Sequence, residues 1–548
     1  MGNGIRILRA KKIITMNRHR PSATHVAIRD GRILAAGEPE DLAGFGDAEL
    51  DERFADKVLT PGFVEGHCHM MEGRVWDFPY VGRQDRIDPE GQRWRGLDSI
   101  DAVVAALKEA EAKMDDAEAP LYAWGFDPIY FTGRRMIVSD LDAVSGTRPV
   151  MVLHSNGHLL NVNSVILSRA GIDRSTNIEG VIKDGNGEPT GELQENAAKY
   201  MAYRVAGNPF ASQMDETAML RFSRSACRTG VTTATDLHSI LDDVTVATYA
   251  AVAGRDDFSL RLLPAFAALS APSAEGIEKV KRLSENNSDK LRYGLIKIMT
   301  DGSIQGFSGR LKWPGYHNGK PNGVWNLSPG ELFQQLQDYH DAGLQVHIHT
   351  NGDEASELMI DAIEAAVERT PRRDHRHTLQ HCQMADESQF RRMAALGICA
   401  NLFANHLYFW GDQHHDITMG PDRASRMDAT GTALRWNVPL AIHSDAPVTP
   451  LGPLFTAWCA VNRKTMSGRV LGEGERLTVP QALFAITQGA AYTLKMDHLV
   501  GSIESGKFAD FAVLDDDPET VAPEDLKDVG VWGTILGGEA HEGARARD

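Results

Sequence analysis

Two histidines at the end of a short apolar segment have the spacing of metal ligands. His67 and His69 close the segment 58–69, and side chains of a strand alternate, so both face the same side and can bind one cation together. Cys68 between them faces away. An isolated His-x-His pair is weak evidence among 20 histidines, but its place at the end of a β-type segment strengthens it. We therefore treat it as one half of a candidate metal site.

Later segments end in the same kinds of residue. An aspartate with several histidines is a mixed nitrogen and oxygen site, suited to Zn²⁺ or a neighbouring divalent cation. Each residue alone has a plainer explanation, such as a core histidine or a turn, and alternation places His347 and His349 on one face without choosing between them. Their joint occurrence favours the metal site. The residues in question are Lys297, His347, His349, His381, His443 and Asp445.

The elements that must position these residues are eight β-type segments separated by helical stretches. This alternation predicts an α/β fold, and eight strands fit a (β/α)₈ TIM barrel better than a doubly wound sheet with its glycine-rich phosphate turn. In such a barrel the reactive groups lie at the carboxyl ends of the strands. The eight segments are 58–69, 230–238, 261–268, 293–302, 344–353, 376–383, 397–406 and 438–447.

The remaining chain predicts two further units. Residues 1–57 hold short strands and an Asp30-Gly31 hairpin, and 497–548 again alternates strand and turn, so both ends are expected to form a flanking β-sandwich. The barrel then covers 58–496. The gap after its first strand is too long for a loop, so about 72–215 is expected to be an inserted subdomain.

Composition narrows the functional classes. The 548 residues carry a formal net charge of −18, which disfavours nucleic acid and anionic membrane surfaces as partners. Five scattered cysteines favour reduced thiols and a cytoplasmic protein. We expect a small-molecule substrate and, because barrels of this kind are often oligomeric, a homodimer or higher homo-oligomer.

The motifs together resemble the amidohydrolase superfamily, and within it the amidohydrolase family 3 branch, which includes proteins similar to N-substituted formamide deformylase. The resemblance covers nearly the whole chain. It implies a metal-dependent barrel that hydrolyses C–N bonds in amides or related groups. The motifs are PGFVEGHCH (61–69), GVTTATD (230–236), KIMTDGS (297–303), HTNGDEA (349–355), LQHCQ (379–383), HSDAPV (443–448) and GSIESGKFADFAVLD (501–515).

The resemblance also implies roles for individual residues. His67 and His69 would bind one metal, His349 and His381 a second, and Asp445 would be both ligand and catalytic proton shuttle. Lys297 matches the lysine whose carbamate bridges two metals in dinuclear members; the alternatives are a buried lysine paired with Asp301 or one that points away. This set implies one or two divalent cations per chain, with Zn²⁺ preferred. The full set is His67, His69, Lys297, His349, His381 and Asp445.

The chain departs from the family pattern at two places, and the second concerns the substrate more than the metal. Glu65 stands where the family has aspartate, and IQGFSGRL follows Asp301-Gly302-Ser303 in a loop that should contact substrate. Aromatic residues in such loops favour an apolar or aromatic ligand. The residues expected to bind substrate are His158, Trp124, Asp301 and Phe307.

The sequence therefore predicts hydrolysis of an amide, formamide, carbamate or cyclic amide. A metal lowers the pKa of bound water to about 7, and Asp445 would act as general base and then general acid. A metal-dependent lyase, isomerase or decarboxylase on the same barrel is one alternative, because a fold does not fix a reaction. A non-catalytic binding protein is another, weakened by the complete ligand set.

Overall fold

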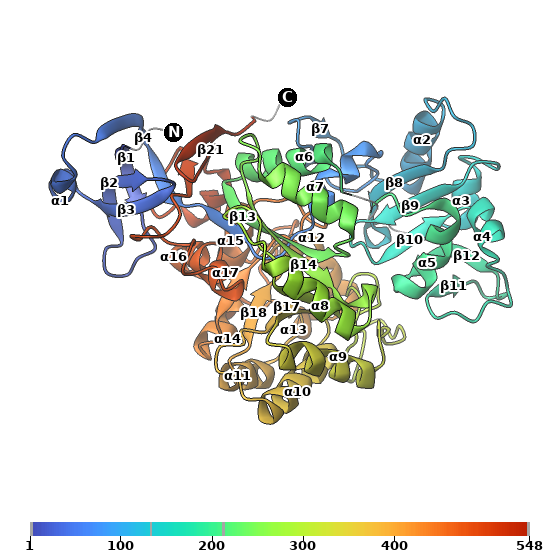
Figure 1. The fold of residues 1–548 in the computed structure, drawn as a ribbon. Coiled ribbons are helices and arrows are strands. Elements are labelled where there is room, and N and C mark those ends of the chain that lie inside the picture. The colour runs from blue at the N-terminus through green and yellow to red at the C-terminus, as the bar shows by residue number, and fades with distance from the viewer. Residues whose placement is uncertain (1–3, 132–133, 211–213, 545–548) are drawn as a thin grey trace.

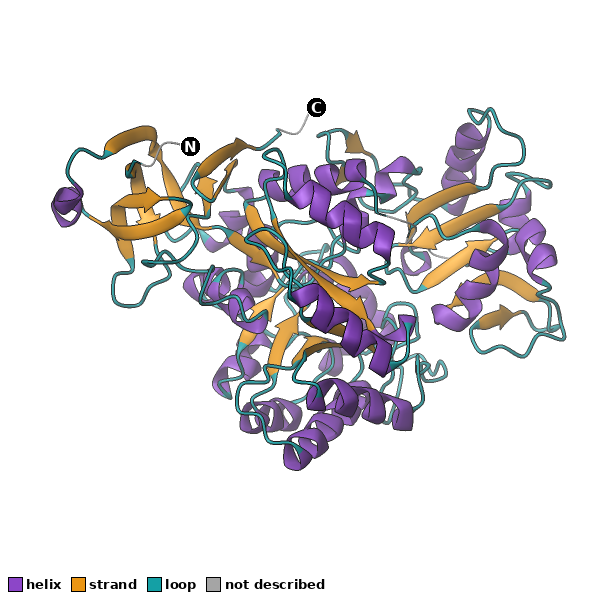
Figure 2. Ribbon diagram, in the orientation of Figure 1, coloured by secondary structure: helices purple, strands orange, loops and turns teal. Residues whose placement is uncertain are grey.

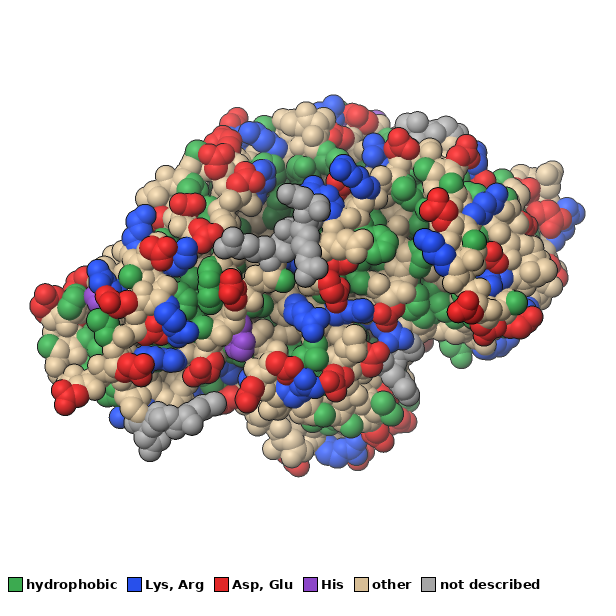
Figure 3. Space-filling view, turned by 90° about the horizontal axis from the view of Figure 1, so that it is seen from above, with side chains coloured by type: hydrophobic (Ala, Val, Ile, Leu, Met, Phe, Trp, Pro, Cys, Tyr) green, Lys and Arg blue, Asp and Glu red, His purple; other side chains and the backbone are tan. Residues whose placement is uncertain are grey.

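A computed structural model describes residues 4–131, 134–210 and 214–544. Its strands and helices form three neighbouring parts: a sheet built from both chain ends, a central α/β part, and an inserted part on the opposite side (Figure 1). Among the described helices, none is long and apolar enough to cross a membrane. Acidic and basic side chains are interspersed on the face shown in Figure 3.

The central part is an eight-stranded sheet in which every neighbouring pair is parallel. Each of the eight predicted segments overlaps one strand of this sheet, and the strands follow one another around the sheet in chain order. They are β5 (Phe63–Glu65), β13 (Val231–Ser239), β14 (Arg261–Ala267), β15 (Leu295–Met299), β16 (Gln345–Thr350), β17 (Thr378–His381), β18 (Cys399–Leu402) and β19 (Leu440–Ile442).

The sheet curls until its first and last strands meet through the residues that follow them. The Asp445 backbone N–H donates to the His67 carbonyl at 3.1 Å, and the His69 N–H donates to the Ala446 carbonyl at 2.8 Å. These bonds lie beyond the ends of β5 and β19, at the level of the candidate ligands. The carboxyl ends of all eight strands therefore surround one space.

Helices cover the outside of this sheet (Figure 2). Two of them flank β16 in the chain: α9 (Pro329–Asp341), which Ser328 and Glu331 cap reciprocally, and α10 (Asp353–Arg369). Both bury one apolar stripe. The other helices of this part are α6 (Glu216–Arg228), α7 (Asp243–Ala253), α8 (Ser273–Ser284), α11 (Glu387–Leu396), α12 (Asn405–Gln413), α13 (Pro421–Ala424), α14 (Thr430–Arg435), α15 (Pro453–Asn462), α16 (Val479–Ala485) and α17 (Gln488–Thr493).

Both chain ends share one seven-stranded sheet, and its pairing pattern does not divide it into the two layers of the predicted sandwich. Its order is β22-β21-β20-β4-β1-β2-β3. The hairpin at Asp30-Gly31 forms as predicted, with positive φ at both residues. The strands are β1 (Arg6–Ile14), β2 (Ser22–Arg29), β3 (Arg32–Gly37), β4 (Glu49–Pro61), β20 (Phe511–Leu514), β21 (Val531–Leu536) and β22 (Glu539–Glu542), and α1 (Pro39–Leu42) follows β3.

The segment after β5 carries a five-stranded sheet of its own, in the order β11-β12-β10-β9-β8. Its apolar core is separate from that of the eight-stranded sheet. Its elements are β8 (Leu121–Phe126), β9 (Val150–His154), β10 (Leu159–Val162), β11 (Val181–Lys183), β12 (Pro189–Gln194), α2 (Ile100–Glu111), α3 (Val138–Asp142), α4 (Ser164–Ala170) and α5 (Glu195–Ala206); the short β6 (Arg86–Ile87) and β7 (Arg93–Trp94) pair beside it.

Candidate active site

Asp445 lies at the centre of three of the predicted ligands. Its Oδ1 is 3.3 Å from His67 Nε2 and 3.2 Å from His69 Nε2, and its Oδ2 is 3.8 Å from His381 Nδ1. His67, His69 and Asp445 each offer a ligand atom within 4.8 Å of the others. The His-x-His pair follows β5 and the aspartate follows β19, so residues from the two edge strands of the sheet meet at one point, as a shared metal site requires.

His349 joins this group through His381. The two rings are linked between His381 Nε2 and His349 Nδ1 at 3.0 Å, and both side chains are almost completely buried. Burial holds the pKa of each imidazole well below its usual value. Both rings are therefore neutral at pH 7, which is the form that binds a metal.

Asp445 is held as a carboxylate. Burial alone would raise its pKa, but the hydrogen bond from His69 and the surrounding histidines and Lys297 lower the pKa below the usual 3.8. Its backbone has φ of 55°, and His381 has φ of 71°, a left-handed region that non-glycine residues seldom occupy. Such backbone strain is typical of functional sites.

Lys297 lies on β15 at the floor of the same space. Its side chain is buried, and its Nζ has no hydrogen-bond partner among the described residues. Burial lowers the pKa of this amine to about 7, although Asp445 opposes the shift. The expected alternative, a pair with Asp301, does not form, because Asp301 instead accepts backbone N–H groups from Asn351, Gly352 and Arg310.

Several buried polar atoms at this point lack protein partners within the described chain. They include Lys297 Nζ and both ring nitrogens of His443, while His381 Nδ1 has only the distant Asp445 carboxylate at 3.8 Å. Buried polar groups are normally paired, and neutral imidazoles with a carboxylate form a ligand set for Zn²⁺. The residues present therefore fit a divalent cation.

Gln380 orients two of the histidines. Its Oε1 accepts from His67 Nδ1 at 2.8 Å and from Asn401 Nδ2 at 2.9 Å, while its Nε2 donates to His347 Nδ1 at 2.7 Å. This bond fixes the His67 tautomer and leaves Nε2 free for a ligand. The bond from Gln380 to His347 also shows how the two histidines of β16 differ: His349 lines the cavity, and His347 belongs to the hydrogen-bond network.

Replacing Gln380 with leucine should weaken cation binding by about 10–100-fold, because His67 loses the acceptor that orients its ring. The free energy of unfolding should fall by about 1–3 kcal/mol for each buried partner left unsatisfied. Titration of the chelator-treated variant with Zn²⁺, and denaturant unfolding, measure the two effects. Unchanged affinity would show that His67 needs no such support.

Glu65 lies beneath the ligands and accepts from the Ser444 hydroxyl at 2.9 Å. Burial raises its pKa from the usual 4.5 to about 8, against hydrogen bonds that lower it. Up to about pH 8 the folded protein thus keeps a proton on Glu65 that the unfolded chain has already lost near pH 4.5. Stability from this group is present at low pH and declines as the pH rises between these two values, by up to about 1.4 kcal/mol per pH unit.

Glu65→Gln should remove this decline, because glutamine never ionises. In chelator-treated protein, the variant should gain stability relative to the parent as the pH is raised from 5 to 8. Denaturant unfolding at both values measures the gain, with the exposed Glu278→Gln as control. Parallel behaviour of parent and Glu65→Gln would contradict a protonated Glu65.

A cavity of about 280 Å³ opens above the ligands. Its floor holds His67, His69, Lys297, His349, His381 and Asp445. An apolar wall faces them, and most of it comes from the segment between β5 and β13. That wall includes Met71, Val75, Trp124, Leu153 and Phe210.

Of the four residues expected to bind substrate, two line this cavity. Trp124 belongs to the apolar wall, and His158 lies with its ring 5.1 Å from that of His349 while its Nδ1 contacts Glu195 Oε2 at 2.9 Å. Asp301 and Phe307 lie outside the lining. Asp301 is fully buried under the loop whose backbone it binds, and the Phe307 ring packs 5.2 Å from Tyr316.

Gln380 and Glu195 carried no role in the sequence predictions, whereas His443 was among the candidate ligands at the strand ends. Gln380 lies inside the LQHCQ motif, but strand alternation places it on the opposite face from His381 and so gave no signal for it. His443 begins HSDAPV, and alternation places it on the same side as Asp445. Glu195, which has φ of 58° and contacts His158, is preceded by no recognisable motif. Its place beside the site becomes apparent only in the folded structure, through its contact with His158.

Comparison with known proteins yields both sequence and structural matches. A model of the amidohydrolase family matches residues 55–540. N-substituted formamide deformylase of Arthrobacter pascens is 26% identical over 546 residues, covering 96% of both chains. An uncharacterized metal-dependent hydrolase from Pyrococcus horikoshii OT3 superposes with a TM-score of 0.70 at 18% identity, covering 95% of this chain and 99% of that one. A Xanthomonas campestris adenosine deaminase with bound zinc has a TM-score of 0.52 at 13% identity, covering 97% and 92%.

Proposed function

This chain belongs to the amidohydrolase family and is a metal-dependent hydrolase of C–N bonds other than peptide bonds, and we propose that it cleaves an amide, formamide, carbamate or cyclic amide of a small apolar or aromatic molecule. The observation that carries the proposal is the convergence of a carboxylate, neutral histidines and an unpartnered lysine on the floor of one cavity with an apolar wall.

The proposed ligand set is that of a centre for one or two divalent cations, with Zn²⁺ preferred. His67, His69 and Asp445 would hold one cation, and His349 and His381 a second, with Lys297 between them as a carbamate. A bound divalent cation supplies Lewis acidity, which lowers the pKa of water from about 16 to about 7 and polarises a substrate carbonyl. The zinc in the X. campestris deaminase supports the choice of metal.

Asp445 would move the proton during hydrolysis. It is ionised, buried and within 3.3 Å of two histidines, so it can accept the proton released when water attacks the carbonyl carbon. The same carboxylic acid can then protonate the leaving nitrogen, since C–N cleavage needs a neutral amine as leaving group. The two transfers leave Asp445 in its starting form.

The segment between β5 and β13, about 72–215, would cover the barrel of residues 58–496 and select the substrate. Trp124, Leu153 and Phe210 offer an apolar surface opposite the ligands, which suits a hydrocarbon or aromatic group beside the scissile bond. His158, fixed by Glu195, faces the ligand side of the cavity and is placed to hydrogen-bond the substrate carbonyl.

The test is a screen of N-benzylformamide, related N-aryl amides and carbamates, and cyclic amides with the Zn²⁺-loaded protein in ¹⁸O-labelled water. A hydrolase should place the label in the formate or carboxylate product; carbonate is not diagnostic, because CO₂ exchanges its oxygens with water. A lyase, isomerase or decarboxylase acting on the same panel would give product without label and would overturn the proposed reaction.

A further inference from the structure

His443 stands among the ligands without a partner. It lies two residues before Asp445, its side chain is fully buried, and neither ring nitrogen has a hydrogen-bond partner in the described part of the chain. Its ring stacks on that of His67, with centroids 4.6 Å apart and planes 17° from parallel. Phe403 stacks on its other side at 4.8 Å.

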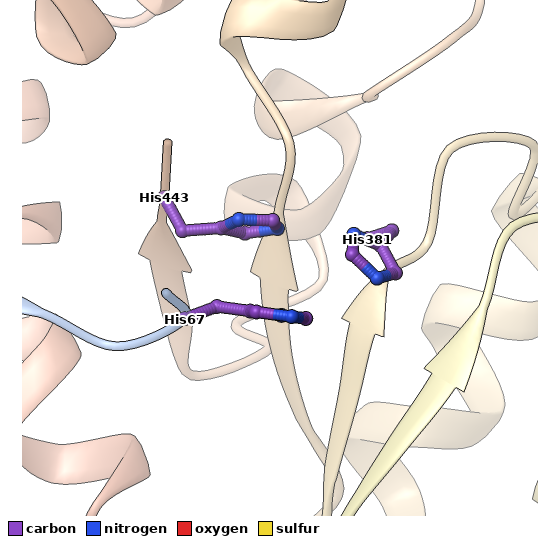
Figure 4. Close-up of side chains that lie close together, drawn as sticks. All are labelled: His67, His381 and His443. Carbon is purple, nitrogen blue, oxygen red and sulfur yellow. The ribbon is translucent and has the colours of Figure 1, made fainter. Parts of the chain in front are cut away.

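Three imidazoles converge at this point from three strands. His67 and His443 lie one above the other, and His381 faces both (Figure 4). The ring centroids of His381 lie 4.5 Å from His67 and 5.0 Å from His443. Each ring offers one nitrogen within 4.8 Å of the other two.

We propose that His443 is a metal ligand, and that His67, His381 and His443 form a three-imidazole position for a divalent cation beside Asp445. This inference rests on the proposed function in one respect, that a cation occupies this end of the cavity. It adds a ligand to the proposed set and changes which position the first cation takes.

The rings need only a small rearrangement to bind one ion. Tetrahedral Zn²⁺ with Zn–N distances of about 2.0–2.1 Å needs nitrogens about 3.4 Å apart whose in-plane lone pairs point at one ion, and the nearly parallel rings of His67 and His443 do not yet point them so. His67 is held through Nδ1 by Gln380, so its Nε2 stays in place. No hydrogen bond holds the His443 ring, so it is the ring that would have to turn, and His381 already directs its Nδ1 toward Asp445.

Both cation positions need the same His67 nitrogen. Because Nδ1 is bound to Gln380, Nε2 serves either the position at His67, His69 and Asp445 or the three-imidazole position. A single cation can therefore occupy only one of these two positions. Three neutral nitrogen donors favour Zn²⁺ over the oxygen-preferring Mg²⁺ or Mn²⁺, so we expect the first Zn²⁺ to bind at the three-imidazole position.

The experiment counts imidazoles around one equivalent of Zn²⁺ in the full-length protein by X-ray absorption. Three imidazoles are expected, whereas the position at His67 and His69 and the position at His349 and His381 would each give two. Zn²⁺ affinity is measured in parallel against a chromophoric chelator. Neither readout needs a substrate.

The variant is His443→Phe, which keeps the stack between His67 and Phe403. It should lose one imidazole from the count and at least about ten-fold in Zn²⁺ affinity, by analogy with losses at supporting residues. His406→Phe is the matched control: His406 is also buried and packs 5.2 Å from Phe403, but its nitrogens are bonded to Gln305 and His414. It should retain the parent count and affinity.

The outcomes separate this inference from the proposed function. Two imidazoles in the parent protein, or a full count and affinity in His443→Phe, would overturn the His443 role and leave the metal-dependent hydrolase intact. A parent protein that binds no Zn²⁺ would overturn both. The count on the parent protein decides the matter even if His443→Phe does not fold.

Discussion

Asp445→Asn should lower kcat by about 10²–10⁴-fold while retaining most of the cation, because asparagine can still offer an oxygen ligand but cannot accept a proton. The carboxylate is well suited to proton transfer: it is buried, ionised at neutral pH and within 3.3 Å of His67 and His69. The measurement is steady-state hydrolysis of whichever substrate the screen identifies, with elemental analysis of the same preparation.

The matched control for this variant is Asp127→Asn. Asp127 is also buried, but it accepts from Trp410 and lies outside the cavity lining, so its loss should leave kcat within a few-fold of the parent. Near-parent turnover in metal-loaded Asp445→Asn would show that another group moves the proton. Loss of the cation would instead identify Asp445 chiefly as a ligand.

Lys297→Ala should reduce the bound divalent metal from two equivalents per chain to one or none in bicarbonate buffer. The amine nitrogen of lysine adds to the carbon of CO₂ and releases one proton, which gives a carbamate with two oxygens. Burial lowers the Lys297 pKa to about 7, so much of this amine is neutral and nucleophilic near pH 7, and it has no partner among the described residues to compete. Elemental analysis with and without bicarbonate measures the difference.

Lys199→Met is the control for this experiment, because Lys199 is another buried lysine of the same cavity. Its Nζ donates to the Gly157 carbonyl at 2.6 Å, so it already has a partner, and its replacement should leave the metal content unchanged. One equivalent in the parent that survives Lys297→Ala would contradict the carbamate. It would favour a mononuclear centre with Asp445 as base.

The strands of the eight-stranded sheet could be predicted from sequence because each combines a short apolar core with turn residues at its ends. The segment 344–353 contains β16, and 438–447 contains β19, although both strands are shorter than the segments. These segments extend past the strands into the loops at the carboxyl ends, whereas Lys297, His349 and His381 lie on the strands themselves. His67 and Asp445 both lie in loops of this kind.

The individual roles within the site were less predictable, because they depend on side chains that meet only after folding. Alternation alone gives His347 and His349 the same face, and Gln380 separates them by binding His347. Asp301 looked like a cavity residue from its position after a strand, yet it binds three backbone N–H groups of neighbouring loops. Partners of this kind leave no periodic signal in the sequence.

The hydrogen bonds that join residues 67–69 to 445–446 also set the time at which the centre can form. Asp445 is synthesised 378 residues after His67. A nascent chain that lacks β19 has the His-x-His pair but neither the carboxylate nor the backbone bonds that hold it in place. The residues proposed to hold a cation can therefore come together only after β19 has been synthesised and has joined the sheet.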